Sequence, residues 1–322
     1  MESERLTSIR SGNKRTLAKA ITLLESSLDK HKEESKDLVG EALMHSGKSF
    51  RIGITGVPGV GKSTFIESLG LYLLNSGFKV AVLAVDPSSP LTGGSILGDK
   101  TRMEMLSREE NAFIRPSPTS GSLGGVAQKT RETILLCEAA GYDIVLIETV
   151  GVGQSEYNVS EMVDFFLVMM LPGGGDELQG LKKGILELAD GMIVNKCDGD
   201  SIQSAKVSKQ QYTSALSLIS KSEYWNTPVL TCSAFNRKDV IQVWKMIGEF
   251  FDLARGSGEL ENRRNKQNVD WMNALIKEVL IGRIYSNSRV NTLLLKLERC
   301  VKKMEMTPYA AAREVIKTLD LS

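Results

Sequence analysis

Short hydrophobic runs alternate with helix-spaced hydrophobic positions through the middle of the chain. Most of these runs are almost continuously apolar, which is typical of strands covered on both faces, as in a parallel sheet with crossover helices. The pattern predicts an α/β fold with a mostly parallel sheet over residues 49–256. The predicted strands are Arg51–Thr55, Val80–Val85, Asp143–Glu148, Phe165–Leu171, Gly191–Asn195 and Val229–Cys232.

Helical spacing dominates at both ends of the chain, so we expect a helical N-terminal extension over residues 1–48 and a helical C-terminal arm over 257–322. The segment Arg255–Gly258 is glycine-rich and is the expected hinge before the arm. Thr307 followed by Pro308 predicts the start of a helix in the arm. The expected apolar stripes are Leu17, Ile21, Leu24 and Leu28 in the extension, and Val269, Met272, Ile276 and Val279, then Ala312, Val315, Ile316 and Leu319, in the arm.

Composition narrows the class of protein. The chain has 322 residues, of which 42% are hydrophobic, enough for a large core and about two domains. The chain has 40 basic and 39 acidic residues, so no general nucleic-acid-binding surface is expected. It has only two histidines, so we do not expect a histidine-based metal site. Four scattered cysteines fit core packing in a reducing compartment. The chain opens without a targeting pattern and its apolar runs are short, so we expect a cytoplasmic protein that does not enter a membrane.

A phosphate-binding loop follows the first predicted strand. A strand, a glycine-rich G-x-x-x-x-G-K-S loop and then a helix form the context that this motif requires. The glycines let backbone N–H groups point at phosphates, and the helix adds its positive N-terminal end. Lys62 is expected to reach the β- and γ-phosphates and Ser63 to ligate Mg²⁺. The nucleotide-binding run is Gly56, Val57, Pro58, Gly59, Val60, Gly61, Lys62, Ser63 and Thr64.

The sequence Asn195-Lys196-Cys197-Asp198 ends a later apolar strand and matches N-K-x-D. A carboxylate there can accept two hydrogen bonds from the guanine N1–H and amine, which adenine lacks, and charge-assisted bonds contribute roughly 1.5–3 kcal/mol each. GTP is therefore favoured over ATP. A further strand leads to Ser233, Ala234 and Phe235, and a backbone N–H near Ala234 is expected to contact the guanine O6.

Acidic residues at strand ends predict the magnesium site, since hard Mg²⁺ prefers oxygen ligands. Glu148 begins Glu148-Thr-Val-Gly151, where most GTPases carry D-x-x-G, and Gly151 can serve as the γ-phosphate sensor. Asp86 ends the second strand, where ligands gather in open α/β sheets. Asp99 closes a glycine-rich segment and is either a metal ligand, a helix cap, or both. The predicted catalytic residues are Lys62, Glu148 and Gly151.

Several long motifs resemble the MeaB/ArgK/MMAA GTPases, a family in which glutamate replaces the usual aspartate at the position of Glu148. The resemblance covers nearly the whole chain, with no departure inside the nucleotide motifs. The motifs are Val85-Asp-Pro-Ser-Ser-Pro90, Thr92-Gly-Gly-Ser-Ile-Leu-Gly-Asp-Lys-Thr-Arg-Met103, Glu148-Thr-Val-Gly-Val-Gly-Gln-Ser-Glu156 and Leu171-Pro-Gly-Gly-Gly-Asp-Glu-Leu-Gln-Gly180.

The resemblance implies a homodimeric, Mg²⁺-dependent GTPase of the SIMIBI class that converts GTP to GDP. It also implies a chaperone for methylmalonyl-CoA mutase or a related acyl-CoA mutase, which gates adenosylcobalamin loading and protects the mutase. Lys62, Ser63, Asp86, Asp99 and Glu148 would then line the Mg·GTP site. The loop Gly173–Glu177 would correspond to a switch that responds to the partner, although a plain connector fits the residues nearly as well.

Three other functions stay open at this point. An ATPase of a transport system is disfavoured by the guanine-type motif, and a metal-insertion GTPase by the shortage of His- or Cys-rich tracts. A binding module with an inactive nucleotide site is disfavoured by the intact Lys62, Ser63 and Glu148.

Overall fold

The computed structural model describes residues 2–26, 28–85, 103–116, 123–149, 155–173, 183–218 and 224–318. The chain divides into two compact units, Met1–Glu261 and Asn262–Ser322, with the boundary inside helix α13 (Glu259–Ser286). The N-terminal helices belong to the same unit as the sheet.

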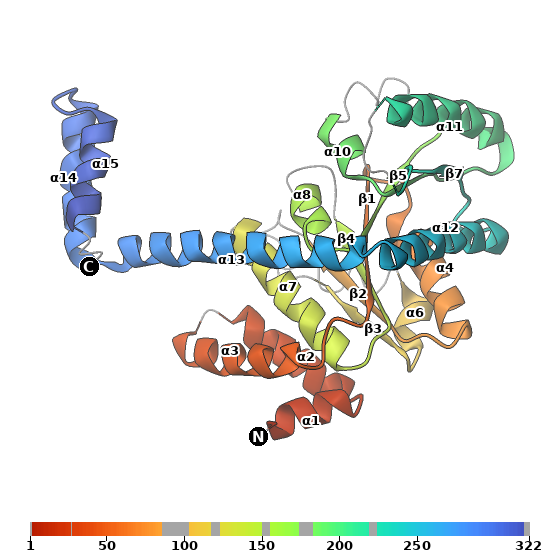
Figure 1. Cartoon of the computed structure of the whole chain (residues 1–322), viewed down its shortest axis with the longest axis horizontal. Coiled ribbons are helices and arrows are strands. Elements are labelled where there is room, and N and C mark those ends of the chain that lie inside the picture. Colours follow the sequence, from red (N-terminus) through yellow and green to blue (C-terminus); the bar gives the residue numbers. More distant parts are fainter. Residues whose placement is uncertain are drawn as a thin grey trace. The chain divides into compact units, whose positions relative to one another are not determined.

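Seven parallel strands within the described residues form one sheet, in the order β3-β2-β4-β1-β5-β6-β7 (Figure 1). This agrees with the predicted α/β class, and six strands fall within one residue of their expected bounds. The seventh, β3, was missed because it has only four residues and lies between polar segments. The strands are β1 (Phe50–Gly56), β2 (Val80–Val85), β3 (Ala112–Arg115), β4 (Ile144–Thr149), β5 (Phe165–Met170), β6 (Gly191–Val194) and β7 (Val229–Thr231).

Helices cover both faces of the sheet, so the strands are buried on each side and read as continuous apolar runs (Figure 1). One hydrophobic cluster unites one face of the sheet with α1 (Glu4–Arg10), α2 (Lys14–Glu25), α3 (Asp29–Leu43), α7 (Leu123–Ala139), α8 (Ser155–Ser160), α10 (Lys183–Leu188) and α11 (Ile202–Ser217). The other cluster unites the opposite face with α4 (Lys62–Asn75), α6 (Glu104–Arg108) and α12 (Arg237–Gly256).

Three aspartates fasten neighbouring strands together at the edge of the sheet where the strands begin. Each aspartate directly precedes a strand, and its carboxylate accepts a backbone N–H from the start of the next strand across. This satisfies backbone donors that the ladder leaves free and fixes the strand register. The bonds run from Lys79 N to Asp143 (2.7 Å), from Arg51 N to Asp164 (2.9 Å) and from Phe166 N to Asp190 (2.9 Å).

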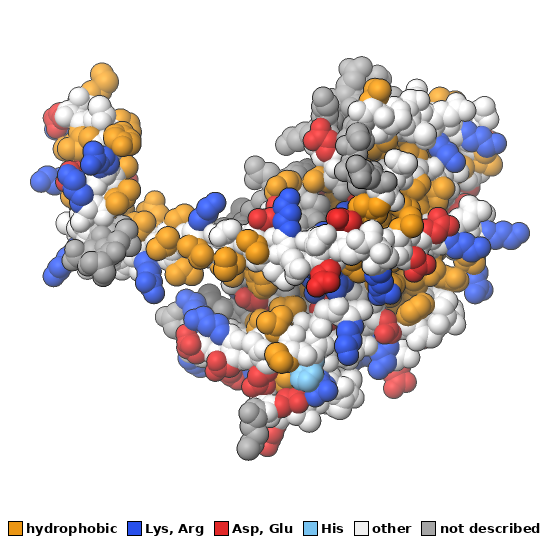
Figure 2. Space-filling view, viewed as in Figure 1, with side chains coloured by type: hydrophobic (Ala, Val, Ile, Leu, Met, Phe, Trp, Pro, Cys, Tyr) orange, Lys and Arg blue, Asp and Glu red, His pale blue; other side chains and the backbone are white. Residues whose placement is uncertain are grey.

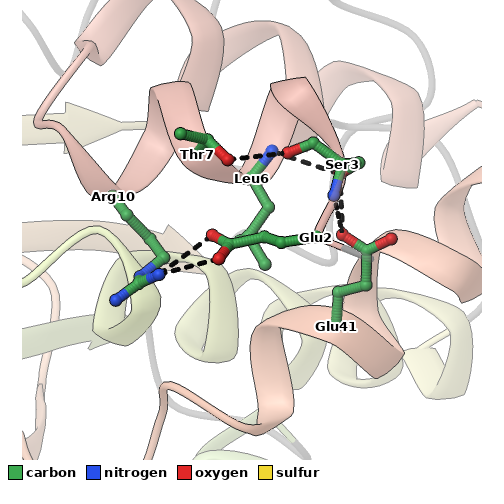
Figure 3. Close-up of polar contacts among 6 residues, drawn as sticks. All are labelled: Glu2, Ser3, Leu6, Thr7, Arg10 and Glu41. Carbon is green, nitrogen blue, oxygen red and sulfur yellow. Dashed lines mark hydrogen bonds and ion pairs between the residues drawn. The ribbon is translucent and has the colours of Figure 1, made fainter.

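The N-terminal extension is held by polar contacts between its first residues and the end of α3. Ser3 donates from its backbone N and its hydroxyl to Glu41, at 3.0 and 2.7 Å (Figure 3). The same hydroxyl caps α1 by accepting the Leu6 N–H at 3.3 Å. The hydrogen bond from the Ser3 hydroxyl is the main cause that lowers the pKa of Glu41.

The expected stripe of the extension holds for Leu17, Ile21 and Leu24, which are buried on α2. The prediction for Leu28 was wrong, because this residue lies between helices and is 53% exposed. Helix α2 ends at Glu25, and the Ser26 hydroxyl accepts the Leu28 N–H, which breaks the helical repeat.

A buried ion pair joins the central strand to α7. The Nε and Nη2 atoms of Arg51 donate to Glu138 at 2.8 and 2.9 Å, and the Glu138 side chain has no exposed surface. Gly47 N also donates to Glu138, at 2.8 Å. Glu138 therefore connects α7, the start of β1 and the chain that enters it from the N-terminal extension.

The second unit contains α14 (Ser288–Lys302) and α15 (Pro308–Thr318), which share a small apolar core. The predicted helix start is confirmed, since the Thr307 hydroxyl accepts the Ala310 N–H at 3.2 Å. The predicted stripe was partly wrong: Val315 is buried as expected, whereas Ala312 is exposed, Ile316 is 55% exposed and Ala311 is buried instead. The fourth predicted member, Leu319, lies outside the described residues. The buried face of α15 is therefore shifted by one residue from the predicted face, because packing against α14 decides which side chains are buried.

Helix α13 displays an exposed row of hydrophobic side chains (Figure 2). The predicted stripe lies on this helix, but its members are exposed in the single chain, at 53% for Val269 and Met272, 49% for Ile276 and 54% for Val279. Gly258, with φ +77°, separates α13 from α12 within the predicted hinge.

Candidate functional site

The predicted phosphate loop connects β1 to α4 at the carboxyl edge of the sheet. Gly61 precedes α4 with φ +95°, and no side chain caps the helix, so its first N–H groups are available to an anion. A Cβ on Gly56 would lie 2.3 Å from the Met169 carbonyl oxygen, so only glycine fits beside β5 there. The loop thus has the backbone geometry of a phosphate cradle.

Lys62 and Ser63 occupy the first turn of α4. The Lys62 ammonium donates to the carbonyl oxygen of Gly56 at 2.9 Å, so it lies across the loop. The Ser63 hydroxyl donates to Glu148 Oε1 at 3.0 Å. Glu148 is 7% exposed and stands near the end of β4, beside β1 in the sheet. The structure therefore brings together the two described residues predicted to ligate Mg²⁺.

A serine hydroxyl and a carboxylate oxygen are the hard donors that Mg²⁺ takes in nucleotide sites. Their contact at 3.0 Å brings both oxygens close enough to bind one cation together. The residues present therefore fit the metal. The other predicted ligands, Asp86 and Asp99, lie outside the described residues, as do Gly151 and residues 174–177 of the predicted switch loop.

Asn195 joins the phosphate loop to the predicted base-reading loop. Its side chain is 1% exposed, donates from Nδ2 to the Val60 carbonyl at 2.8 Å and accepts the Ala234 N–H at Oδ1, at 3.2 Å. A Cβ on Gly61 would lie only 2.9 Å from Asn195 Nδ2. The two loops are thus fixed to each other through one amide.

The backbone departs from regular strand geometry just before Asp198. Lys196 has φ +56°, a left-handed conformation that costs a non-glycine residue roughly 1–2 kcal/mol. Cys197 N then donates to the Cys232 carbonyl at 3.0 Å, one residue later than regular parallel pairing would place it. The carboxylate of Asp198, on an exposed residue, accepts the Ser233 hydroxyl at 2.6 Å.

The loop after β7 is itself positioned by α12. Asp239, in the first turn of this helix, accepts the Ser233 N–H at 2.9 Å. Phe235 is 87% exposed beside Ala234. The sequence offered no sign of the contact from Asp239, because an acidic residue in the first turn of a helix is a common way to complement the helix dipole.

None of the helices in the described residues combines the length and apolar character needed to cross a membrane. The described residues also contain no group of three or more His, Cys, Asp and Glu side chains arranged to hold a metal ion.

Known proteins match this chain in sequence over most of its length. A family model described as "Methylmalonyl Co-A mutase-associated GTPase MeaB" matches residues 17–289. A probable GTPase of Mycobacterium tuberculosis is 49% identical over 98% of this chain and 94% of its own. GTPase ArgK of Escherichia coli is 45% identical over 97% of this chain and 95% of its own.

A mitochondrial relative and a solved structure agree with these matches. The methylmalonic aciduria type A homolog of Mus musculus is 45% identical over 95% of this chain and 76% of its own. A crystal structure of a protein called LAO/AO transport system kinase has a TM-score of 0.79 and 36% identity, covering 99% of each chain. The chain therefore belongs to the methylmalonyl-CoA mutase-associated GTPase family, MeaB, and is a P-loop GTP hydrolase.

Proposed function

We propose that this GTPase binds Mg·GTP between the phosphate loop and the N-K-x-D loop, and that its nucleotide cycle serves an acyl-CoA mutase. The contact between Ser63 and Glu148 at 3.0 Å supports the nucleotide part of this proposal, because it joins the two oxygens that would bind the metal. Lys62 would neutralise β- and γ-phosphate charge, and the open N-terminus of α4 would bind phosphate oxygens. Asp86 and Asp99 would complete the oxygen set, and the Gly151 N–H would sense the γ-phosphate.

Magnesium, when bound, would supply positive charge against the phosphate oxygens as the terminal phosphate leaves. This role can be tested with Ser63→Ala and Glu148→Ala, which should lose magnesium-dependent turnover more than nucleotide binding without the metal. Lys62→Ala should lose both phosphate affinity and turnover. Parental turnover in Glu148→Ala would contradict the metal assignment.

Asp198 would read guanine, with Asn195 and Lys196 shaping the loop and the Ala234 N–H contacting O6. The hydrogen bond from Ser233 would orient the Asp198 carboxylate for this role. GTP at about a hundred times its dissociation constant should stabilise the protein by roughly 2.7 kcal/mol, and ATP should not. Asp198→Asn should shift preference toward xanthosine nucleotides, because the new amide can donate to the xanthine 2-oxo group. Equal melting shifts from ATP and GTP in the parent would exclude guanine recognition.

The client would be methylmalonyl-CoA mutase or a related adenosylcobalamin-dependent mutase, since the family description names association with that enzyme. In this role, GTP binding and hydrolysis would gate cofactor loading and protect the mutase, with both proteins in the cytoplasm. Adding the mutase should raise the GTPase rate of the parent, and the two should co-purify. If the mutase neither binds nor changes the rate, the chaperone role fails while the GTPase activity stands.

A homodimer formed through α13 would bury the exposed apolar row of this helix. Four of its side chains lie at i, i+3, i+7 and i+10, and each is about half exposed in the single chain. A two-fold dimer would use this surface twice and bury it from water. The alternative is that the arm covers its own GTPase unit in solution.

Light scattering can separate these two arrangements. Met272→Glu with Ile276→Glu should yield monomers, whereas Lys277→Glu on the same helix should leave the dimer intact. A dimer that persists in the double variant would reject α13 as the dimer interface.

A further inference from the structure

Two buried threonine hydroxyls form a hydrogen bond one residue further along β4 than Glu148. Thr149 Oγ1 donates to Thr55 Oγ1 at 2.8 Å, and neither residue has exposed surface. Burying a hydroxyl costs free energy unless it is hydrogen-bonded, and valine has nearly the same shape without this cost. Two threonines at these positions therefore require a reason beyond filling space.

Their place in the sheet suggests that reason. Strands β1 and β4 pair in register up to Ile54 and Glu148, so Thr55 and Thr149 are the next residues on each strand. Beyond them β1 enters the phosphate loop at Gly56, while β4 ends at Thr149. The hydroxyl bond is thus the last described link between these strands before their chains separate.

The two hydroxyls and the predicted metal-binding pair lie on opposite faces of the sheet. Side chains alternate along a strand, and Ile54 belongs to the cluster facing α4, so Thr55 faces the α7 and α8 side. Likewise Ile147 belongs to the α7 and α8 cluster, which places Thr149 on that side and Glu148 on the α4 side. Glu148 is therefore held from one face by Ser63, and its strand is held from the other by the Thr149–Thr55 bond.

We propose that the Thr55–Thr149 hydrogen bond is a positioning device for magnesium, which fixes the end of β4 so that Glu148 meets Ser63 at the correct separation. Neither threonine touches the metal or the nucleotide in this role. The inference rests on the proposed magnesium site and adds two residues that act through Glu148. Losing a partner hydrogen-bonded directly to a metal ligand typically weakens metal binding about 10- to 100-fold, so this less direct restraint should contribute about the lower figure.

The test measures binding of a fluorescent GDP analogue across a range of free Mg²⁺, with EDTA as the metal-free reference. Thr149→Val should raise the Mg²⁺ concentration for half-maximal tightening by about tenfold. Affinity for the analogue in EDTA should stay within about twofold of the parent, because the phosphate loop keeps its own contacts. Thr149→Ser keeps the hydroxyl and should behave like the parent.

The double variant Thr55→Val/Thr149→Val separates positioning from stability. With both hydroxyls gone no buried donor or acceptor is stranded, so its melting temperature should return toward the parent while the Mg²⁺ shift remains. Thr130→Val is the matched control, because this threonine of α7 is also buried and donates to the Val126 carbonyl. It should leave the Mg²⁺ response unchanged.

Three outcomes would overturn the inference: an unchanged Mg²⁺ response in Thr149→Val, a parental response in the double variant, or the same shift in Thr130→Val. A parent whose GDP binding ignores Mg²⁺ would instead refute the proposed metal site, and the inference with it. If Glu148→Ala abolishes the Mg²⁺ effect and Thr149→Val does not alter it, the metal site stands and only the positioning role fails.

Discussion

Replacing Asn195 by alanine removes the amide that fixes the phosphate loop to the base-reading loop. The change strands two backbone groups, the Val60 carbonyl and the Ala234 N–H, on residues that are 0% and 5% exposed. A stranded buried group costs about 1–3 kcal/mol, so two cost roughly 2–6 kcal/mol. Water entering from the neighbouring nucleotide edge would lower this sum, so we expect about 2 kcal/mol.

Calorimetry and nucleotide titration measure the two consequences of this change. For a unit of this size, 2 kcal/mol lowers the melting temperature by roughly 4–8 °C. GTP affinity should fall at least about tenfold, since 1.4 kcal/mol of lost loop positioning is tenfold in binding. Asn195→Asp would not serve as a control, because a carboxylate cannot donate to the Val60 carbonyl.

Asn287→Ala is the matched control, because Asn287 caps α14 in the other unit and accepts the Arg289 and Val290 N–H groups. Losing a cap costs about 1 kcal/mol, so this variant should lose stability and keep parental GTP affinity. The reasoning fails if Asn195→Ala binds GTP like the parent and melts no lower than Asn287→Ala.

Three further changes test the start of β1, the phosphate loop and the N-terminal extension. Glu138→Ala should destabilise the protein by about 3–5 kcal/mol in urea unfolding, because it leaves the Arg51 guanidinium without its buried partner; a loss below 1 kcal/mol would mean that water replaces the pair. Gly56→Ala should abolish GTP binding in calorimetry, because the new Cβ would lie 2.3 Å from the Met169 carbonyl oxygen, and retained affinity would show that the loop can shift. Glu41 has a lowered pKa in the folded chain, so the stability it adds is present above its ordinary value near 4.5 and is lost as pH falls through the lowered one. The difference in melting temperature between the parent and Glu41→Gln should therefore be constant near neutral pH and vanish in acid. A difference that grows in acid would contradict this prediction.

The sequence alone determined the class of fold and was enough to predict the central site residues. Buried parallel strands read as apolar runs, so six strands could be placed to within one residue. The phosphate loop and Asn195-Lys-Cys-Asp198 could be recognised because backbone approach to phosphate needs glycines at fixed positions, and guanine needs a carboxylate. These requirements are local, and local chemistry leaves a pattern in consecutive residues.

Only the tertiary structure decided which residues face each other across the sheet. The contact of Ser63 with Glu148, the amide bridge from Asn195 and the Thr55–Thr149 bond join residues between 39 and 135 positions apart. The strand order decides such contacts, because β4 lies beside β1 although β2 and β3 intervene in the chain. The same reason explains the errors at Leu28 and Ala312: helical spacing fixes a periodicity, whereas the partner surface decides where a helix ends and which face is buried.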